Sequence, residues 1–481
     1  MRTPPLASGP EGPRALRPLL TTVLDALSDG TRKRGGPLPA GGPETVAARV
    51  RDAVGDLLPD EGDPEALRHL VRTLAEGAAD PADPLCAAHL HCPPLAVAAA
   101  ADLAASVLNP SLDSWDQAPA ASELERLLTR VLANEVYGHP RRDAGPHRHA
   151  APPQGATSPH RPAADNTPDA LVTTGGTESN QLALLLAREA LGADVRLVCG
   201  TNAHHSLPRA TWLLGTPQPV LVPAPAGTLD PAALNTALTD HPGPHLVAAT
   251  AGTTDAGLID PLPDIAAVCR THGARLHIDA AYGAGLLFST RHRDKLTGLD
   301  TAATVTLDLH KLGWQPAAAG ILAVHDARDL TPLRQRADYL NADDDTDAGL
   351  PDLLGRSLRT TRRPDILKIA ATLQTLGRTG LGHLVDQVCA RAAEFADLVH
   401  THPGFELHDR PTISTVLFRP VHTTDDDLAA TRRHLLTHGR AVLGRARLDG
   451  RLWLKATLLN PHTRPDDLAA LLKTVEGTPH R

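Results

Sequence analysis

The sequence predicts an α/β fold with a mainly parallel central sheet. Between residues 170 and 324, short runs rich in aliphatic and β-branched residues alternate with helical stretches, which is typical of a sheet covered on both faces. The chain has 481 residues, enough for two or three domains with substantial cores. Aromatic residues make up only 2% of it, so the core must be aliphatic. The expected strands are 170–174, 195–199, 219–222, 245–251, 275–279, 303–307 and 320–324.

Helical periodicity precedes, interrupts and follows these strands. The expected helices are 15–27, 44–58, 64–76, 94–108, 121–136, 178–191, 262–272, 366–376, 385–400 and 465–474. Two further strands are expected at 414–418 and 451–459, which indicates an α+β region at the C-terminal end. We therefore expect an N-terminal arm and helical segment over 1–120, a large domain over 121–363 and a small α+β domain over 364–481.

One segment of the large domain does not fit this alternation. Residues 139–169 are rich in Pro, His and Arg and almost empty of large apolar side chains. Such a composition cannot bury a core, so we expect a mobile insertion. Its histidines also suggest a metal site, but a solvated loop is the better interpretation.

Charge and hydropathy exclude several classes of protein. The formal net charge is −8 and no dense basic stripe exists, which argues against a nucleic-acid partner. The apolar run 95–108 is shorter than the roughly 20 residues that span a bilayer, and Asp102 interrupts it. The start of the chain lacks the apolar region of a signal peptide. Five cysteines without framework spacing favour a reducing cytoplasm.

Two residues at strand ends carry the strongest chemical signal. Asp279 ends the run RLHID, and Lys311 follows the run 303–307 within TVTLDLHKLGWQP. A lysine amine can form a Schiff base with the aldehyde of pyridoxal phosphate (PLP), while a carboxylate can keep the pyridine nitrogen protonated so that the ring accepts electrons. The alternatives without a catalytic role are a helix cap for Asp279 and an exposed side chain for Lys311.

Three weaker signals lie at other strand ends. Gly175, Gly176 and Thr177 join an expected strand to an expected helix, where backbone N–H groups and the helix dipole favour an anion. His204 follows the run 195–199 and could stack on a flat ring, although it is one of 25 histidines. Thr254 follows the run 245–251 and could hydrogen-bond a cofactor. Taken alone, the Gly175-Gly176 turn could be an ordinary tight turn. The occurrence of all these residues at successive strand ends is more informative than any one of them.

In this order, the segments GGTESN, AHHS, GTTDAG, HIDAAYG and DLHK resemble the group II PLP-dependent amino acid decarboxylases. The resemblance extends from about Leu85 to the C-terminal helix and implies PLP fold type I, which is similar to aspartate aminotransferase. It implies that Lys311 carries PLP, that Asp279 pairs with the pyridine nitrogen and that His204 stacks on the ring. The implied cofactor contacts are Gly175, Gly176, Thr177, His204, Thr254, Asp279, Ala281, Asp308, His310 and Lys311.

Further segments are similar to the L-2,4-diaminobutyrate and siderophore-pathway lysine decarboxylase branch, namely HLHCPP, SLDSWDQAPAASELE, HKLGWQP, ADYLN, SLRTTRRPDILK and LWLKATLLNP. This branch implies α-decarboxylation of an L-amino acid, most simply 2,4-diaminobutyrate, lysine or ornithine, to an amine and CO₂. Tyr339 in ADYLN falls on the loop tyrosine that protonates the product carbon. The insertion 139–169, the segment GWQPAAAG and Pro364 depart from the family pattern, which bears on the substrate more than on the chemistry.

Substrate contacts and partners follow from the same resemblance. Asp116 is a candidate for the distal ammonium of a diamino acid, and His91 and Cys92 are candidates for the entrance. No metal is expected, because His89, His91 and Cys92 crowd three ligands into four positions. The family implies a homodimer with its active site at the interface. Other PLP chemistry, such as transamination or decarboxylation-coupled oxidative deamination, and a non-catalytic homologue remain alternatives.

Overall fold

The computed structural model describes residues 4–138 and 167–478. The described chain divides into two compact units. The large unit comprises Pro94–Thr254 and Leu258–Val385, and the terminal unit comprises the residues before Pro94, Asp255–Gly257 and the residues from Asp386 onward. The expected three-part division at 120/121 and 363/364 stays a prediction. The expected insertion 139–169 lies outside the described residues except for its last three.

The large unit contains a seven-stranded sheet in the order β1-β7-β6-β5-β4-β2-β3. Strand β7 runs antiparallel to both of its neighbours, and the other neighbouring pairs are parallel. The expectation of a mainly parallel sheet is therefore confirmed. The strands are β1 (Asp169–Thr173), β2 (Arg196–Gly200), β3 (Val220–Val222), β4 (His245–Thr250), β5 (Arg275–Asp279), β6 (Thr304–Asp308) and β7 (Gly320–Val324).

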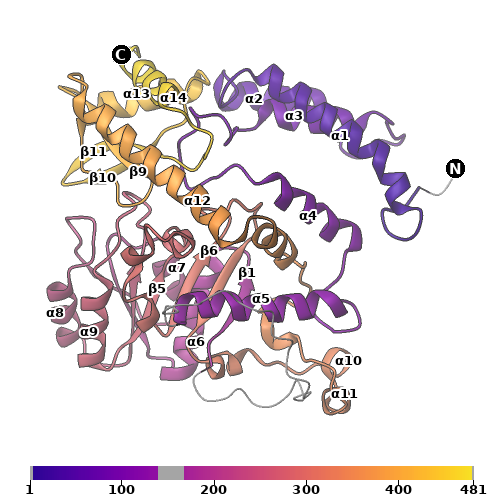
Figure 1. Ribbon diagram of the computed structural model, residues 1–481, viewed down its shortest axis with the longest axis vertical. Helices are drawn as coiled ribbons and strands as arrows, with labels where there is room; N and C mark the ends of the chain where they lie inside the picture. The colour runs from indigo at the N-terminus through magenta and orange to yellow at the C-terminus, as the bar shows by residue number, and fades with distance from the viewer. Residues whose placement is uncertain (1–3, 139–166, 479–481) are drawn as a thin grey trace. The chain divides into compact units, whose positions relative to one another are not determined.

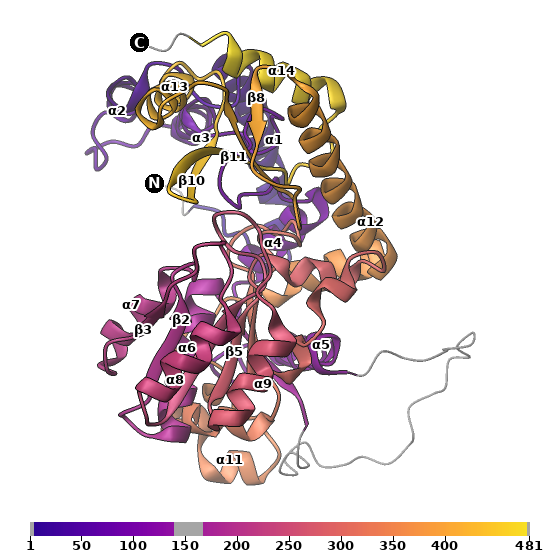
Figure 2. The same ribbon diagram turned by 90° about the vertical axis from the view of Figure 1, so that its left-hand side faces the viewer.

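Helices run alongside this sheet (Figures 1 and 2). They are α5 (Pro119–Tyr137), α6 (Gly176–Leu191), α7 (Ser206–Leu214), α8 (Pro231–Asp240) and α9 (Leu262–His272). Helix α4 (Ala96–Leu108) precedes them in the large unit. Helix α8 begins where sequence rules place a start, because the Asp230 side chain accepts bonds from two backbone N–H groups and Pro231 follows it. Helix α9 ends at Gly273, whose φ of 63° is easy for glycine.

Short elements complete the large unit between β5 and the long helix α12 (Ile366–Thr401). They are η1 (Gly283–Phe288), η2 (Arg293–Leu296), η3 (Leu299–Thr301), η4 (Ala327–Leu333), α10 (Asp338–Asn341), α11 (Asp343–Asp347) and η5 (Leu354–Arg356). Helix α12 contains one non-helical residue, Gly377, with φ 62°. The expected helices 366–376 and 385–400 are therefore two parts of one helical stretch, and the second begins earlier than expected.

The terminal unit builds its core on a four-stranded sheet in the order β10-β11-β9-β8, in which all neighbours are antiparallel. Phe395 of α12 and Phe418 of β9 meet edge to face at a ring distance of 5.3 Å within this core. Helices α1 and α3 pack against each other beyond it. Its elements are α1 (Gly12–Arg34), α2 (Gly42–Val54), α3 (Ala66–Gly77), β8 (Phe405–Leu407), β9 (Thr415–Pro420), α13 (Asp425–Thr437), β10 (Gly444–Leu448), β11 (Arg451–Thr457) and α14 (Pro465–Glu476). None of the helices formed by the described residues combines the length and apolar character that a membrane-spanning segment needs.

Candidate active site

The turn between β1 and α6 borders a narrow space, called the anion cradle below, which is lined by Gly175, Gly176, Ala281 and His310. Gly176 is the first residue of α6, and its N–H donates to Asp308 Oδ2 at 2.9 Å. A Cβ on Gly176 would lie 3.0 Å from the Ala281 Cβ, and one on Gly175 would lie 3.3 Å from His310 Cε1. Side chains at either position would therefore fill the space. Thr177 occupies the first turn of the same helix and is exposed. This arrangement suits a small anionic group approaching backbone N–H groups.

Lys311 lies directly beside this cradle. Its side chain is only 17% exposed, and its Nζ lies 3.7 Å from Asp308 Oδ2. His310 Nδ1 lies 2.6 Å from the other oxygen of the same carboxylate. The exposed-lysine alternative does not describe Lys311, because Asp308 holds its amine at the end of β6. The amine and the anion cradle thus share one buried carboxylate.

Asp279 ends β5 and is almost completely buried. Its Oδ1 accepts the Ala281 N–H at 3.0 Å, and its Oδ2 accepts a bond from Asn180 Nδ2 at 2.8 Å. The first bond closes a local turn after β5 and is not the helix cap given as the alternative role, because the next helical element, η1, begins at Gly283 without a side-chain cap. The second comes from helix α6, so Asp279 is also held from outside its own turn. A buried carboxylate with these two donors is suited to pair with a cation.

His204 lies in the loop between β2 and α7. Its Nδ1 is 2.8 Å from the Ser206 hydroxyl, and the Ser206 N–H approaches the same nitrogen at 3.4 Å. Burial lowers the pKa of His204, while the charge of Asp279 raises it and the charges of His205 and Lys311 lower it further. Asp279 and Lys311 both lie within electrostatic reach of His204. The imidazole is neutral near neutral pH because the net pKa shift is downward.

A buried polar network lies behind Asp279, and sequence analysis assigned no role to its members. Asn180 is its centre, because its side chain also bonds Ser206 Oγ at 2.9 Å, His277 Nε2 at 3.0 Å and Thr306 Oγ1 at 2.8 Å. His277 is fully buried, and burial lowers its pKa to about 4. Asn180, Ser206 and His277 stand inside the segments GGTESN, AHHS and HIDAAYG, so those segments contained the signal.

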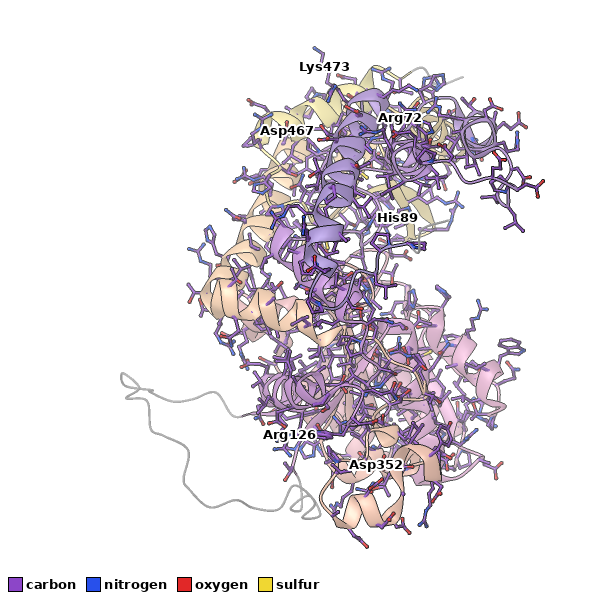
Figure 3. All side chains as sticks on the ribbon, turned by 90° about the vertical axis from the view of Figure 1, so that its right-hand side faces the viewer. Arg72, His89, Arg126, Asp352, Asp467 and Lys473 are labelled. Carbon is purple, nitrogen blue, oxygen red and sulfur yellow. The ribbon has the colours of Figure 1, made fainter. Side chains whose placement is uncertain are left out.

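Two other expected site residues, Thr254 and Tyr339, are exposed. Thr254 is exposed, whereas the adjacent Thr253 is buried and its Oγ1 accepts the Leu258 N–H at 3.0 Å. Tyr339 lies on α10 with 82% of its surface exposed. Asp352, labelled in Figure 3, accepts a bond from Asn341 Nδ2 at 3.1 Å at the end of that helix. None of these contacts brings Tyr339 to Lys311.

The expected substrate contacts differ in exposure and in the unit that contains them. Asp116 is an exposed residue of the large unit, in the turn before α5. In the terminal unit, His91 is exposed and Cys92 is buried. The neighbouring His89, labelled in Figure 3, is exposed too, and burial of its ring is still sufficient to lower its pKa. Across residues 4–138 and 167–478, no group of three or more His, Cys, Asp or Glu side chains could hold a metal ion.

Comparison with known proteins identifies the family of this chain. The pyridoxal-dependent decarboxylase conserved domain matches residues 56–421. The chain belongs to the pyridoxal-dependent decarboxylase family. This decarboxylase is 36% identical to the L-2,4-diaminobutyrate decarboxylase of Rhizobium meliloti (strain 1021), over 99% of its own length and 96% of that protein. It is 29% identical to the L-2,4-diaminobutyrate decarboxylase of Acinetobacter baumannii, over 81% of its own length and 78% of that protein.

A solved structure agrees in fold. The glutamate decarboxylase domain of diaminobutyrate-pyruvate transaminase and L-2,4-diaminobutyrate decarboxylase from Vibrio parahaemolyticus superposes with a TM-score of 0.80. The two chains are 29% identical, and the match covers 98% of this decarboxylase and 96% of that chain. The resemblance stated from the motifs and PLP fold type I are therefore confirmed. The protein is a PLP-dependent carboxy-lyase that acts on an amino acid.

The residues present fit PLP. The Gly175-Gly176 turn leaves room at the N-terminus of α6 for a phosphate, because a Cβ at either glycine would occupy it. Lys311 presents a primary amine beside that turn. Asp279 presents a buried carboxylate with only two of its lone-pair directions occupied by N–H groups. These are the anion site, the amine and the acidic partner that this cofactor requires.

Proposed function

We propose that this decarboxylase acts on an L-diamino acid, with 2,4-diaminobutyrate as the first candidate and lysine and ornithine as the next. The products are the corresponding amine and CO₂. The observation that carries this proposal is the near full-length similarity to L-2,4-diaminobutyrate decarboxylases. Its geometric support is the meeting of Lys311, Asp308, Asp279 and His204 at the ends of neighbouring strands.

PLP, when bound, supplies an electron sink for the carboxylate bond that breaks. Lys311 provides the amine that attaches it, and Asp308 holds that amine in place until then. Asp279 presents its buried carboxyl group to a positive charge opposite to it and would stabilise that charge. His204 presents a flat neutral ring, since its pKa is lowered by burial, and such a ring can fix the plane of the reacting groups.

The remaining residues complete the proposed site. Gly175, Gly176 and Thr177 bind the phosphate, with Ala281 closing the cradle and His310 contacting Asp308. Thr254 contacts the cofactor from the loop after β4. Tyr339 delivers a proton to the substrate Cα once its loop covers the site, because its helix α10 is short and exposed. Asp116 receives the distal ammonium, and His91 and Cys92 line the entrance.

A homodimer is the proposed assembly, with the active site at its interface. Its support is a row of exposed leucines on the N-terminal helices, where a monomer would leave apolar surface in water. Leu24 and Leu27 of α1 are 66% and 43% exposed, and Leu70 and Leu74 of α3 are 39% and 66% exposed. The proposed location is the cytoplasm, on the grounds of cysteine usage given above.

The decisive experiment measures CO₂ release by the purified, PLP-loaded enzyme. L-2,4-diaminobutyrate, lysine and ornithine are the test substrates, with glutamate and tyrosine as matched controls that lack a distal ammonium. Reduction with borohydride should label the peptide that contains Lys311. Lys311→Ala should abolish this labelling and slow CO₂ release roughly a thousandfold or more, the scale seen when a covalent catalytic group is removed.

Lys311→Arg is the control for charge, because it retains a cation near Asp308 without a primary amine. It should fail in the same way as Lys311→Ala. Preference for glutamate or tyrosine would overturn the proposed substrate class. Cofactor binding without CO₂ from any amino acid, together with a keto acid or an aldehyde as product, would replace decarboxylation by another PLP reaction.

A further inference from the structure

We propose that Asn180 is a positioning residue that controls two functional groups at once. Through one directed chain of hydrogen bonds, its amide keeps Asp279 as a bound carboxylate and keeps the proton of His204 on Nε2. This inference rests on the roles of Asp279 and His204 in the proposed function. It adds a residue, and a reason for the protonation state of both groups, that the comparisons do not supply.

The direction of the chain follows from the amide of Asn180. Its Nδ2 faces Asp279 Oδ2 at 2.8 Å and Ser206 Oγ at 2.9 Å. A flipped amide would place its oxygen against the carboxylate oxygen, with two acceptors and no proton between them. The nitrogen must therefore face Asp279. Both N–H groups of Asn180 are then used, one on Asp279 and one on Ser206.

The opposite side of the amide holds it in this orientation. Asn180 Oδ1 accepts from Thr306 Oγ1 at 2.8 Å and lies 3.0 Å from His277 Nε2. An amide oxygen only accepts, so His277 carries its proton on Nε2. His277 Nδ1 lies 2.9 Å from Thr304 Oγ1 and must then accept the threonine proton. All four hydrogen-bonding positions of the Asn180 amide are filled, and rotation of that amide group would break all four hydrogen bonds.

The first branch of the chain ends at Asp279. Its Oδ2 accepts from Asn180 and its Oδ1 accepts from the Ala281 N–H at 3.0 Å. Each oxygen thus receives a proton donor, and neither faces an acceptor that would require Asp279 to be protonated. Donors of this kind favour the ionised carboxylate. Because Asn180 lies on α6 and Ala281 follows β5, the carboxylate is held from two elements and cannot turn.

The second branch ends at His204. Ser206 Oγ accepts from Asn180, so its own proton is available to His204 Nδ1 at 2.8 Å. The backbone N–H of Ser206 approaches the same nitrogen at 3.4 Å. Two donors converge on Nδ1, which leaves the proton of the neutral ring on Nε2. The charged and titratable groups that act on this ring are Asp279, His205 and Lys311.

The two branches predict two different defects. Asn180→Asp keeps the shape of the side chain but places a second carboxylate beside Asp279, so the pair shares a proton and Asp279 loses its full charge. The dissociation constant of PLP should rise at least about tenfold. Ser206→Ala removes the hydroxyl that donates to His204 Nδ1 and accepts from Asn180, and leaves the bond from Asn180 to Asp279 in place. Cofactor affinity should stay within about twofold, while kcat falls about tenfold and its pH profile shifts, with KM little changed.

Ser179→Ala is the matched control. Ser179 neighbours Asn180 on α6 and is equally buried, but its hydroxyl bonds Thr173 Oγ1 at 2.7 Å, outside the chain. This variant should retain both the cofactor affinity and the pH profile of the wild type. The measurements are loss of cofactor absorbance on dialysis of the purified holoenzyme and the pH dependence of kcat.

Wild-type cofactor affinity in Asn180→Asp would overturn the Asp279 branch. A wild-type kcat and pH profile in Ser206→Ala would overturn the His204 branch. If Asn180→Asp does not fold, Ser206→Ala still provides a test of the inference. A Ser179→Ala defect as large as either would show a general packing effect and also overturn the inference. If the wild type binds PLP but releases no CO₂, the proposed function fails, whereas the affinity measurement on Asn180→Asp still decides the Asp279 branch.

Discussion

Arg362 and Glu125 form an ion pair that is almost wholly excluded from solvent. Arg362 Nη1 lies 2.9 Å from both carboxylate oxygens of Glu125, and the two side chains are 2% and 6% exposed. The same guanidinium donates to the Leu112 carbonyl at 3.0 Å, and the Leu112 N–H donates back to the Arg362 carbonyl at 2.9 Å. This pair ties the middle of α5 to the segment that leads into α12.

Removing one partner should therefore destabilise the large unit severely. Glu125→Gln leaves the Arg362 cation buried without its counter-charge, which costs about 3–5 kcal/mol when a buried pair is broken. The measurement is the urea midpoint of the purified enzyme, followed by tryptophan fluorescence. Exchange of both partners, Arg362→Met with Glu125→Leu, should recover most of the loss, because the uncompensated charge is gone.

The control is an exposed ion pair on the same helix. Glu123 bonds Arg126, labelled in Figure 3, at the solvent side of the same helix. Glu123→Gln should change stability by less than about 1 kcal/mol, the usual range for exposed pairs. Equal losses from the two Glu→Gln changes would mean that burial of the Arg362 pair contributes nothing.

His277 should make the stability of the enzyme fall in mild acid. Burial lowers the pKa of His277 to about 4, from 6.5 for an unperturbed histidine. The unfolded chain therefore binds a proton between these values and the folded chain does not. The full stability is present above pH 6.5 and is lost as the pH falls towards 4. The loss is on the order of 3 kcal/mol as an upper limit.

A matched variant isolates this effect from the titration of carboxylates. His277→Gln retains an N–H donor for Asn180 but cannot take up a proton. Urea midpoints of the wild type should fall more steeply than those of His277→Gln between pH 6.5 and pH 4. Parallel curves for the two proteins would show that His277 does not titrate differently in the folded and unfolded states.

Local sequence patterns predict some strands and helices of this protein and miss others. Strands β5 and β7 begin and end where the sequence places them, because Leu276 and Ile278 alternate with polar residues in β5 and β7 is a continuous apolar run that begins at a glycine. Strand β10 was not predicted, since GRARL exposes two arginines and buries only Gly444, Ala446 and Leu448. Its partner β11 supplies the burial that the local sequence does not reveal. Helix α7 was also missed, because Pro208 lies in its first turn.

The same limit applies to the site. Asp279 and Lys311 were expected together because ligands gather at the carboxyl ends of parallel strands, and Asp308 was added by the family resemblance. Asn180 was not expected there, although it stands in a quoted segment, because its bonds to Asp279 and Thr306 join residues 99 and 126 positions apart. Such pairing depends on which strands neighbour α6 in space. Local periodicity contains no information on that order, so a network of this kind needs the folded structure.

The exposed leucines of α1 and α3 lead to a prediction about assembly. Replacing Leu24 and Leu74 by glutamate places two charges on the proposed dimer surface, where both residues are 66% exposed. Since both side chains already face solvent within one chain, the change should cost the monomer little stability. Light scattering after gel filtration should show a dimer for the wild type and a monomer for the double variant, with decarboxylation lost.

Arg14→Glu on α1 provides the comparison, because it changes charge at an exposed position without touching the leucine row. It should remain a dimer with normal activity. A double leucine variant that stays dimeric and active would place the interface elsewhere. A wild type that is monomeric and active would remove the homodimer from the proposed function.

Tyr339 and Tyr137 should respond to the same substitution in opposite ways. Tyr339 is 82% exposed on α10, so Tyr339→Phe should leave the melting temperature unchanged. Its hydroxyl is the proposed proton donor to the substrate Cα, and its loss should slow amine formation about a hundredfold or more, a typical general-acid contribution. In air, aldehyde and ammonia should appear in the products, because dissolved dioxygen can oxidise the carbon that is not protonated and is itself reduced to peroxide.

Tyr137 is the matched buried tyrosine. Its hydroxyl lies 3.3 Å from the Ala323 carbonyl and 3.4 Å from the Ala303 carbonyl, and burial raises its pKa well above the usual value. Tyr137→Phe should therefore cost about 1 kcal/mol of stability while the ratio of amine to aldehyde stays constant. Chromatography of the products and thermal unfolding of both variants measure the two effects. An unchanged product ratio and rate in Tyr339→Phe would assign the proton to a different group, because a hydroxyl that delivers it cannot be removed without consequence.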